Sequence, residues 1–130
     1  VLHHPIAPLP AAFRDVVDES AYGLEQGAAV ADSLAAAGVE LVVSAHLHWP
    51  FVTRYRGLTV VGAPGAASFP PSYLLVETDP EGTTVSLVPL AGPKGIREAY
   101  EYAIDDEIRG RAIERVVSER DRETPSPTPL

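Results

Sequence analysis

Two pairs of histidines are the residues of this sequence best suited to chemistry. His3 and His4 are adjacent in "VLHHP", and His46 and His48 are separated by one residue in "SAHLHW". The chain contains four histidines and no cysteine. Imidazole nitrogens bind transition metals readily, and without cysteine any metal here must be held by His, Asp, Glu or backbone oxygen. The two pairs therefore predict a metal site if folding brings them together.

The residues around each pair predict the end of a β-strand. The apolar run "VELVVSA" before His46 is typical of a strand buried on both faces, and "VLHHP" indicates a strand end that leads into a stiff, Pro-rich loop. Apolar residues at helical spacing predict a helix over residues 13–37, with Gly38 as its stop. In such a strand–helix–strand unit, both parallel strands end at the same edge of the sheet. We therefore expect His3 or His4 to lie close to His46 and His48.

The rest of the chain predicts antiparallel strands followed by a helix. The runs "FVTRYRG" and "LTVVGAP" indicate two short strands turned at Gly57, and "SYLLVETD" and "TTVSLVPL" indicate a hairpin joined at "PEG". An apolar stripe at helical spacing predicts one helix over residues 94–122, and the polar, Pro-rich residues 123–130 are expected to be disordered. The predicted fold class is α/β. Residues 1–93 form the main domain, a βαβ unit followed by antiparallel strands, and the C-terminal helix comes after it.

The acidic composition argues against several function classes. The formal net charge is −8, and residues 1–93 contain 3 basic and 9 acidic residues, which gives −6. Such a charge repels a phosphate backbone, so we expect no non-specific nucleic-acid binding. No apolar run approaches the roughly 18 residues of a membrane span and no signal peptide is visible, so we expect no membrane association and a cytoplasmic location. The chain does not begin with methionine, and we expect it to be part of a longer protein.

Each candidate residue also has a plainer interpretation. An H-x-H pair is a weak motif, and a single histidine is more often a surface or core residue than a ligand. Arg54 and Arg56 could contact a substrate phosphate, but a solvent-facing edge strand explains them as well. Trp49 and Phe51 could stack on a nucleobase or pack beside the site. The stretch "GAPGAAS" has no phosphate-loop pattern and indicates a tight passage from strand to loop.

The order of the motifs resembles that of a known enzyme family. "VLHHP", a helix and then "VVSAHLHWPFVTRYRGLTVVGAPGAAS" resemble the C-terminal half of the calcineurin-like metallophosphoesterases, and are most similar to the branch with the class III cyclic-nucleotide phosphodiesterases. The similarity covers roughly residues 1–90. It implies the C-terminal half of a four-layer α/β/β/α sandwich. It also implies a binuclear centre of two divalent transition metals, Mn, Fe or Zn, whose bound hydroxide attacks a phosphoester substrate.

The resemblance assigns roles to individual histidines. It implies that His3 and His46 share one metal, and that His48 binds the second metal and belongs to the catalytic machinery. His4 is expected to face elsewhere or to line the substrate side. Ala45 stands where the family usually has glycine, which would cost about 1 kcal/mol if that position needs positive φ. The family's N-terminal motifs, D-x-H, G-D-x-x-D and G-N-H-D/E, are absent from this sequence, and with them the bridging aspartate.

Two functions from different classes follow. In the first, the chain is part of a hydrolase that cleaves a small-molecule phosphoester. A phosphodiester is the favoured substrate, and the resemblance suggests a cyclic nucleotide. This function requires an N-terminal half that this sequence lacks. In the second, it is a catalytically inactive fragment that acts as a single-metal or partner-binding module. A fragment of this kind would expose a sheet edge, which would allow it to form a homodimer.

Overall fold

The structure, a computed structural model of the chain, describes residues 1–9, 23–107 and 110–117. The chain divides into two compact units, Val1–Ala63 and Pro64–Leu130. Both units combine helices with small sheets, so the fold is mixed α/β. The predicted domain end at residue 93 coincides with the start of helix α4 (Pro93–Ile104), inside the second unit.

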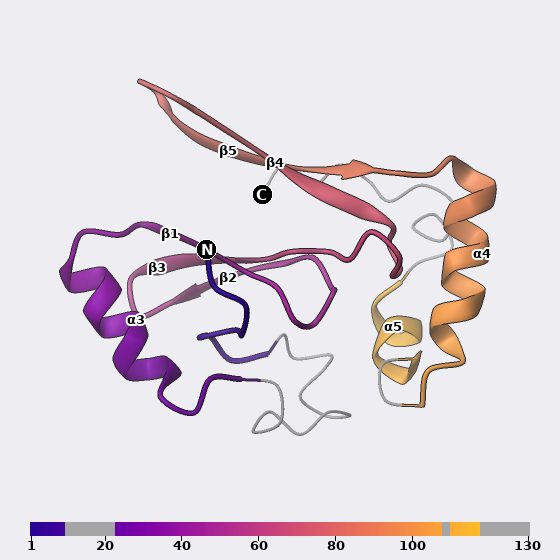
Figure 1. Ribbon diagram of the computed structural model, residues 1–130, viewed down its shortest axis with the longest axis horizontal. Coiled ribbons are helices and arrows are strands. Elements are labelled where there is room, and N and C mark those ends of the chain that lie inside the picture. The colour runs from indigo at the N-terminus through magenta and orange to yellow at the C-terminus, as the bar shows by residue number, and fades with distance from the viewer. Residues whose placement is uncertain (10–22, 108–109, 118–130) are drawn as a thin grey trace. The chain divides into compact units, whose positions relative to one another are not determined.

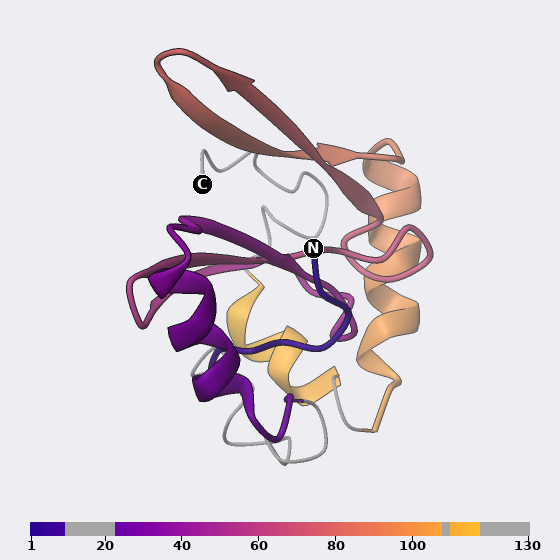
Figure 2. The same ribbon diagram turned by 60° about the vertical axis from the view of Figure 1, so that its left-hand side comes forward.

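The first unit contains a three-stranded sheet with helix α3 (Gly27–Ala36) alongside it (Figures 1 and 2). The strands are β1 (Leu41–Ser44), β2 (Phe51–Tyr55) and β3 (Leu58–Gly62), in the order β1-β3-β2. β1 and β3 are parallel, whereas β2 and β3 are antiparallel. The apolar residues Leu58, Val60 and Val61 of β3 are almost fully buried, as the central position of this strand requires.

Glycines set two of the reversals in this unit. Gly38, which follows the C-cap residue Ala37 of α3, has a φ of 79°. Its N–H donates to the carbonyl of Ala35, and the N–H of Val39 donates to the carbonyl of Leu34. These are the two hydrogen bonds of a Schellman cap, so the predicted stop at Gly38 is confirmed. Arg56 and Gly57, with φ of 50° and 83°, form the two-residue turn between β2 and β3. Positive φ at both central residues is the mark of a type I′ hairpin turn, and the turn predicted at Gly57 is also confirmed.

The predicted helix over residues 13–37 is described only from Gly23 onward, because residues 10–22 lie outside the described part of the chain. In that part, α3 begins at Gly27 after a turn. A side chain at Gly27 would approach the carbonyl oxygen of Ile6 to 2.9 Å, so glycine here lets the N-terminal segment cross close to the start of the helix.

The second unit consists of a hairpin and two helices. Strands β4 (Ser72–Asp79) and β5 (Gly82–Pro89) pair antiparallel along their whole length (Figure 1), and the Asp79 carboxylate accepts hydrogen bonds from the N–H groups of Glu81 and Gly82 in the turn. The hairpin predicted at "PEG" is therefore confirmed.

The C-terminal helix is interrupted. The sequence predicts one helix over residues 94–122, but α4 ends at Ile104 and a second helix, α5 (Gly110–Val116), follows. Two aspartates, Asp105 and Asp106, come directly after α4, whose last turn has no basic residue, and negative charge is unfavourable at a helix C-terminus. A side chain at Gly110 would collide with the carbonyl of Ile104, so glycine allows the sharp reversal there. The predicted tail, 123–130, lies outside the described residues.

Candidate metal centre

A parallel backbone pairing brings the two histidine motifs together. Leu2 forms a bridge with Ser44, the last residue of β1. The Leu2 N–H donates to the carbonyl of Val43 at 2.8 Å, and the Ala45 N–H donates to the carbonyl of His3 at 3.0 Å. Because both segments run in the same direction, the residues that follow leave the sheet at the same edge. This is the arrangement that the βαβ pattern predicts, although the N-terminal strand is reduced to a single bridge.

Three imidazole rings meet at this edge. Nδ1 of His46 lies 3.2 Å from Nε2 of His3. The ring of His4 is centred 4.3 Å from that of His46 and 5.0 Å from that of His3. One nitrogen from each of the three residues lies within 4.8 Å of the other two. The donor set is chemically suited to a transition metal, because neutral imidazole is a ligand for Zn, Cu, Fe and Ni.

The backbone around "AHLH" is a tight turn and not an extended strand. His46 and His48 have φ of 65° and 53°, and the N–H of Leu47 donates to the carbonyl of Ala45 at 2.7 Å. A hydrogen bond from residue i+2 to residue i with positive φ at the centre indicates a classic γ-turn at His46, a rare and strained conformation. Leu47 is buried, with 4% of its surface exposed, and it anchors the turn in the core.

This turn changes the position of the strain predicted from the sequence. Ala45 stands where the resemblance expects glycine, but Ala45 is not among the residues with positive φ. Positive φ occurs instead at His46 and His48, on either side of Leu47. Non-glycine residues in that region cost roughly 1–3 kcal/mol each and are concentrated at functional sites. Alanine therefore fits at position 45, and the strain lies at the candidate ligands themselves.

His48 is the predicted site residue that does not join the group. Its side chain is exposed, and it is not one of the three histidines whose ligand atoms lie within 4.8 Å of one another. Extended backbone would have placed His46 and His48 on one side, but the strand has already ended at Ser44. The assignment of His3, His46 and His48 as ligands stays a prediction. His4, which the resemblance does not favour as a ligand, lies inside the group.

The electrostatics of the group favour neutral imidazole at His46. Partial burial lowers the pKa of His46 below its usual value, and the positive charges that His4, His3 and His48 would carry when protonated lower it further. A metal ligand must be deprotonated on the coordinating nitrogen. His46 is therefore held in the form that a metal requires. Among the described residues, no carboxylate belongs to the group.

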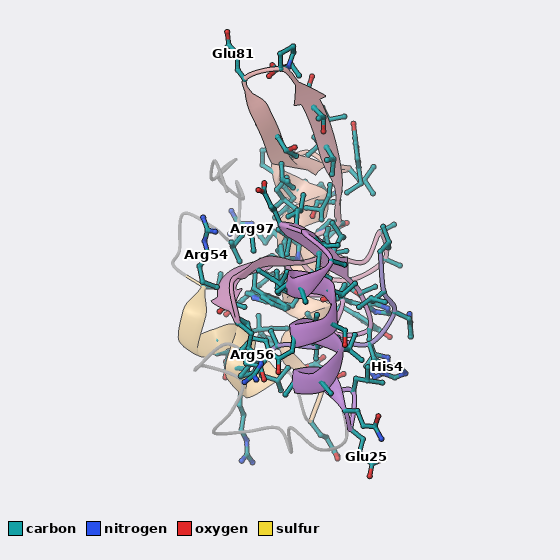
Figure 3. The ribbon with its side chains drawn as sticks, turned by 90° about the vertical axis from the view of Figure 1, so that its left-hand side faces the viewer. His4, Glu25, Arg54, Arg56, Glu81 and Arg97 are labelled. Carbon is teal, nitrogen blue, oxygen red and sulfur yellow. The ribbon has the colours of Figure 1, made fainter. Side chains whose placement is uncertain are left out.

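The arginines considered for phosphate binding lie elsewhere. The Arg56 guanidinium donates two hydrogen bonds to the Asp32 carboxylate on α3, so this residue ties the β2–β3 turn to the helix. Arg54 is exposed on β2, an edge strand of the sheet. Figure 3 shows Arg54 and His4 on opposite sides of the first unit. The edge-strand interpretation of Arg54 is the one that fits this position.

Phe51 packs against the sheet. Its side chain is 8% exposed, and its ring occupies the space where a side chain at Gly62 would lie. The packing interpretation of Phe51 therefore explains its position. Trp49 is half-buried, and its backbone oxygen would lie 2.8 Å from a Cβ at Gly62. Glycine at position 62 thus allows the chain after His48 to return closely over the end of β3.

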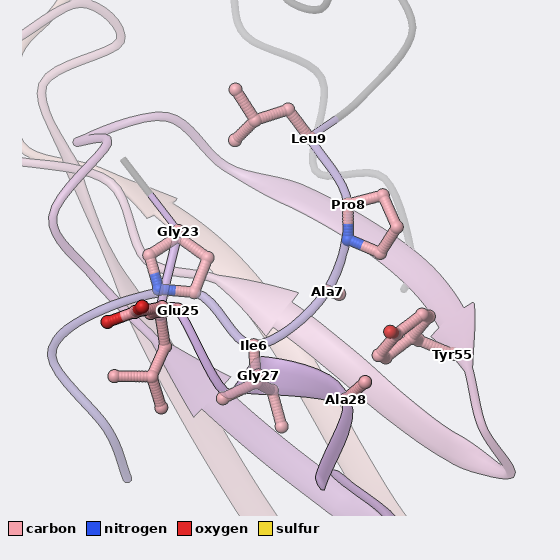
Figure 4. A pocket seen from close by; sticks show the side chains of 11 residues that line it. Ile6, Ala7, Pro8, Leu9, Gly23, Glu25, Gly27, Ala28 and Tyr55 are labelled. Carbon is pink, nitrogen blue, oxygen red and sulfur yellow. The ribbon is translucent and has the colours of Figure 1, made fainter. Parts of the chain in front are cut away.

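A pocket of about 440 Å³ lies in the first unit, and no histidine lines it (Figure 4). Residues of the segments 5–9 and 23–28 line it together with Tyr55. Its lining is mainly apolar, and Glu25 is its one carboxylate among the described residues. The lining offers no set of metal ligands, so the histidine group is the stronger candidate for chemistry.

Comparison with known proteins adds no assignment. No protein-family model matches the chain, and a search of the curated proteins finds no match either. In the part of the chain that the structure describes, no helix has both the length and the apolar character needed to cross a membrane. The histidine group and the sequence motifs around it therefore carry the functional assignment.

Proposed function

We propose that this chain is the C-terminal part of a metallophosphoesterase that hydrolyses a small-molecule phosphoester. The observation that carries the proposal is the 3.2 Å separation between Nδ1 of His46 and Nε2 of His3. The resemblance assigns these two residues to the same metal, and they belong to motifs that are distant in sequence. A phosphodiester is the favoured substrate, and the resemblance suggests a cyclic nucleotide.

We further propose that the complete protein has the four-layer α/β/β/α architecture. Two features of the described residues support this. The chain forms two separate sheets, one of three strands and one of two, and helices accompany them. A two-stranded sheet is marginally stable by itself, so β4 and β5 require further packing or pairing. Strands from an upstream segment would provide it.

In the proposed reaction, the histidines bind and orient while the metals supply the chemistry. Two divalent metals would generate the nucleophile and neutralise charge on the phosphoryl oxygens. His3 and His46 would hold one of them through neutral nitrogens, and the lowered pKa of His46 favours this form at neutral pH. The backbone hydrogen bond between Ala45 and His3 keeps the two motifs in register. His48, exposed beyond the turn, is proposed to serve the second metal together with upstream residues.

The second candidate function is an inactive module that binds a single metal or a partner. The absence of a carboxylate from the histidine group, among the described residues, favours it. Without a bridging carboxylate, the described residues offer no means of holding two metals at a short separation. The two functions differ in what precedes Val1 in the parent protein: the hydrolase requires the aspartate and G-N-H motifs there, and the module does not.

The test uses the parent protein, including any residues that precede Val1. Loaded with Mn²⁺, it is expected to hydrolyse a bis-aryl phosphate and to contain close to two transition metals per chain by elemental analysis. His46→Ala should remove most of the hydrolysis. Glu40→Gln, at an exposed position in the same unit, is the matched control and should retain it. An unchanged rate in His46→Ala would contradict the proposal.

A further inference from the structure

The ring of His4 lies beside the contact between His3 and His46, with its centre 4.3 Å from that of His46. We propose that His3, His4 and His46 form a mononuclear three-histidine site for Zn²⁺, complete within this chain. The ligand atoms of all three lie within 4.8 Å of one another. The resemblance assigns ligand roles to His3, His46 and His48, so it does not predict that His4 binds the metal. It also implies a centre that needs residues upstream of this chain, whereas the three-histidine site needs none.

The distances match those of a shared cation. Zinc binds imidazole nitrogen at about 2.0–2.1 Å in tetrahedral geometry, so two ligand nitrogens on one ion lie roughly 3.3 Å apart. The separation between Nδ1 of His46 and Nε2 of His3 is 3.2 Å, which already has this value. The nitrogen of His4 lies within 4.8 Å and must move inward by at most about 1.5 Å. His3 and His4 are both exposed, so their side chains can rotate without disturbing the core.

The local backbone explains how two adjacent histidines reach the same point. Neighbouring side chains diverge in an extended strand, but the chain bends at both His3 and His4. The bend is fixed on its far side by Pro5, which is buried and whose carbonyl accepts a hydrogen bond from the Leu24 N–H at 2.9 Å. Both imidazoles are thereby held on the side of His46, with ring centres 5.0 Å apart.

The surroundings favour a cation over a hydrogen bond alone. A hydrogen bond between neutral imidazoles accounts for the His3–His46 contact but gives no reason for a third ring at 4.3 Å. Residues 1–63 contain 3 basic and 6 acidic residues, a net charge of −3, which attracts a divalent ion. Three imidazole ligands also leave a tetrahedral ion one open position, as in catalytic zinc sites.

This inference concerns the same site as the proposed function. It rests on that function in one respect only, namely that the histidines are metal ligands. The experiment measures Zn²⁺ binding by this chain at neutral pH, after removal of metal with a chelator, using competition with a chromophoric zinc indicator. The unmodified chain is expected to bind one Zn²⁺. His4→Ala should weaken binding at least about tenfold, because loss of a ligand costs more than loss of its supporting hydrogen bond. The matched control, Glu40→Gln at an exposed position of the same unit, should change the affinity less than about threefold.

A second variant and a second probe secure the result. His4→Gln keeps the side chain polar, and circular dichroism of each variant establishes that it is folded. Co²⁺ absorption then reports whether the coordination geometry changes in His4→Gln, as the three-histidine site requires. Equal affinity in His4→Ala and the unmodified chain would overturn the inference, as would the absence of zinc binding. If the parent protein fails to hydrolyse phosphoesters while zinc binding still depends on His4, the proposed function fails and the three-histidine site stands.

Discussion

Nδ1 of His46 lies 3.2 Å from Nε2 of His3, although 43 positions separate the two residues in the sequence. The contact depends on backbone pairing and not on the side chains, because Leu2 bridges to Ser44 and the His3 carbonyl accepts from Ala45. The distance is that of two nitrogens on one metal ion. The geometry of the sheet edge thus determines whether these residues can act together.

The pairing of Leu2 should control metal affinity. Leu2→Pro removes the N–H that donates to the Val43 carbonyl, so His3 loses its alignment with His46. We expect Zn²⁺ affinity to fall at least about tenfold, a loss typical of disrupted ligand support. Leu2→Ala keeps the N–H and is the matched control, measured by the same indicator competition. Equal affinities in the two variants would show that the bridge does not position the site.

The ion pair between Asp32 and Arg56 should make stability depend on pH. The hydrogen bonds from Arg56, and then its charge, lower the pKa of Asp32. The unfolded chain therefore binds more protons than the folded chain near the normal carboxyl pKa, and stability rises with pH through this range. The contribution of the pair is complete above about pH 4 and is lost as the pH falls through the folded pKa.

Asp32→Asn tests this dependence by urea unfolding. The variant should be less stable than the unmodified chain at about pH 6, and the difference should shrink as the pH falls below about 3.5. Both side chains are about half exposed, 53% for Asp32 and 43% for Arg56, so the effect should also weaken in salt. A difference that stays constant over the whole pH range would mean that the carboxylate charge is not involved.

The cap of α3 should require a residue that tolerates positive φ. Gly38 has a φ of 79°, and a side chain there would meet no other atom within 4 Å, so the cost of alanine is conformational and not steric. We expect Gly38→Ala to lower the free energy of unfolding by about 1 kcal/mol. Gly38→Asn should lose less, because asparagine is the next most common residue in this conformation. Chemical denaturation of both variants checks the order, and alanine at least as stable as asparagine would contradict it.

Two buried serines should respond to alanine in opposite directions. The hydroxyl of Ser44 has no hydrogen-bond partner among the described residues, whereas that of Ser72 donates to the carbonyl of Pro70 at 2.8 Å. Ser44→Ala removes an unpaired buried polar group and should raise the free energy of unfolding by about 1 kcal/mol. Ser72→Ala leaves the carbonyl without this donor and should lower it by a similar amount. Equal losses in the two variants would show that Ser44 has a partner in solution.

The sequence predicts the features of this fold that depend on local chemistry. Gly38 and Gly57 are at the positions where the chain needs positive φ, and few other residues adopt it without cost. The apolar run before Ser44 forms the predicted strand. The meeting of the two histidine motifs is also predictable, because it follows from the handedness of a strand–helix–strand crossover.

Other features depend on tertiary context that periodicity does not contain. The apolar residues of the predicted last helix continue at helical spacing across Asp105, so this pattern does not indicate a break. The residues that indicate the end of α4 are the adjacent aspartates, Asp105 and Asp106, and Gly110. The γ-turn at His46 places Leu47 in the core. A prediction of extended backbone for "AHLH" does not include this turn. The strand–helix–strand pattern allows either His3 or His4 to approach His46, and only the family resemblance favours His3 as the ligand.

The central claim is that histidines from two distant motifs hold one cation, and X-ray absorption at the zinc edge of the Zn²⁺-loaded chain tests it most directly. The predicted spectrum shows three imidazole nitrogens at about 2.0–2.1 Å, with the outer-shell scattering that histidine rings produce. A zinc ion surrounded by oxygen, with no imidazole scattering, would contradict the account.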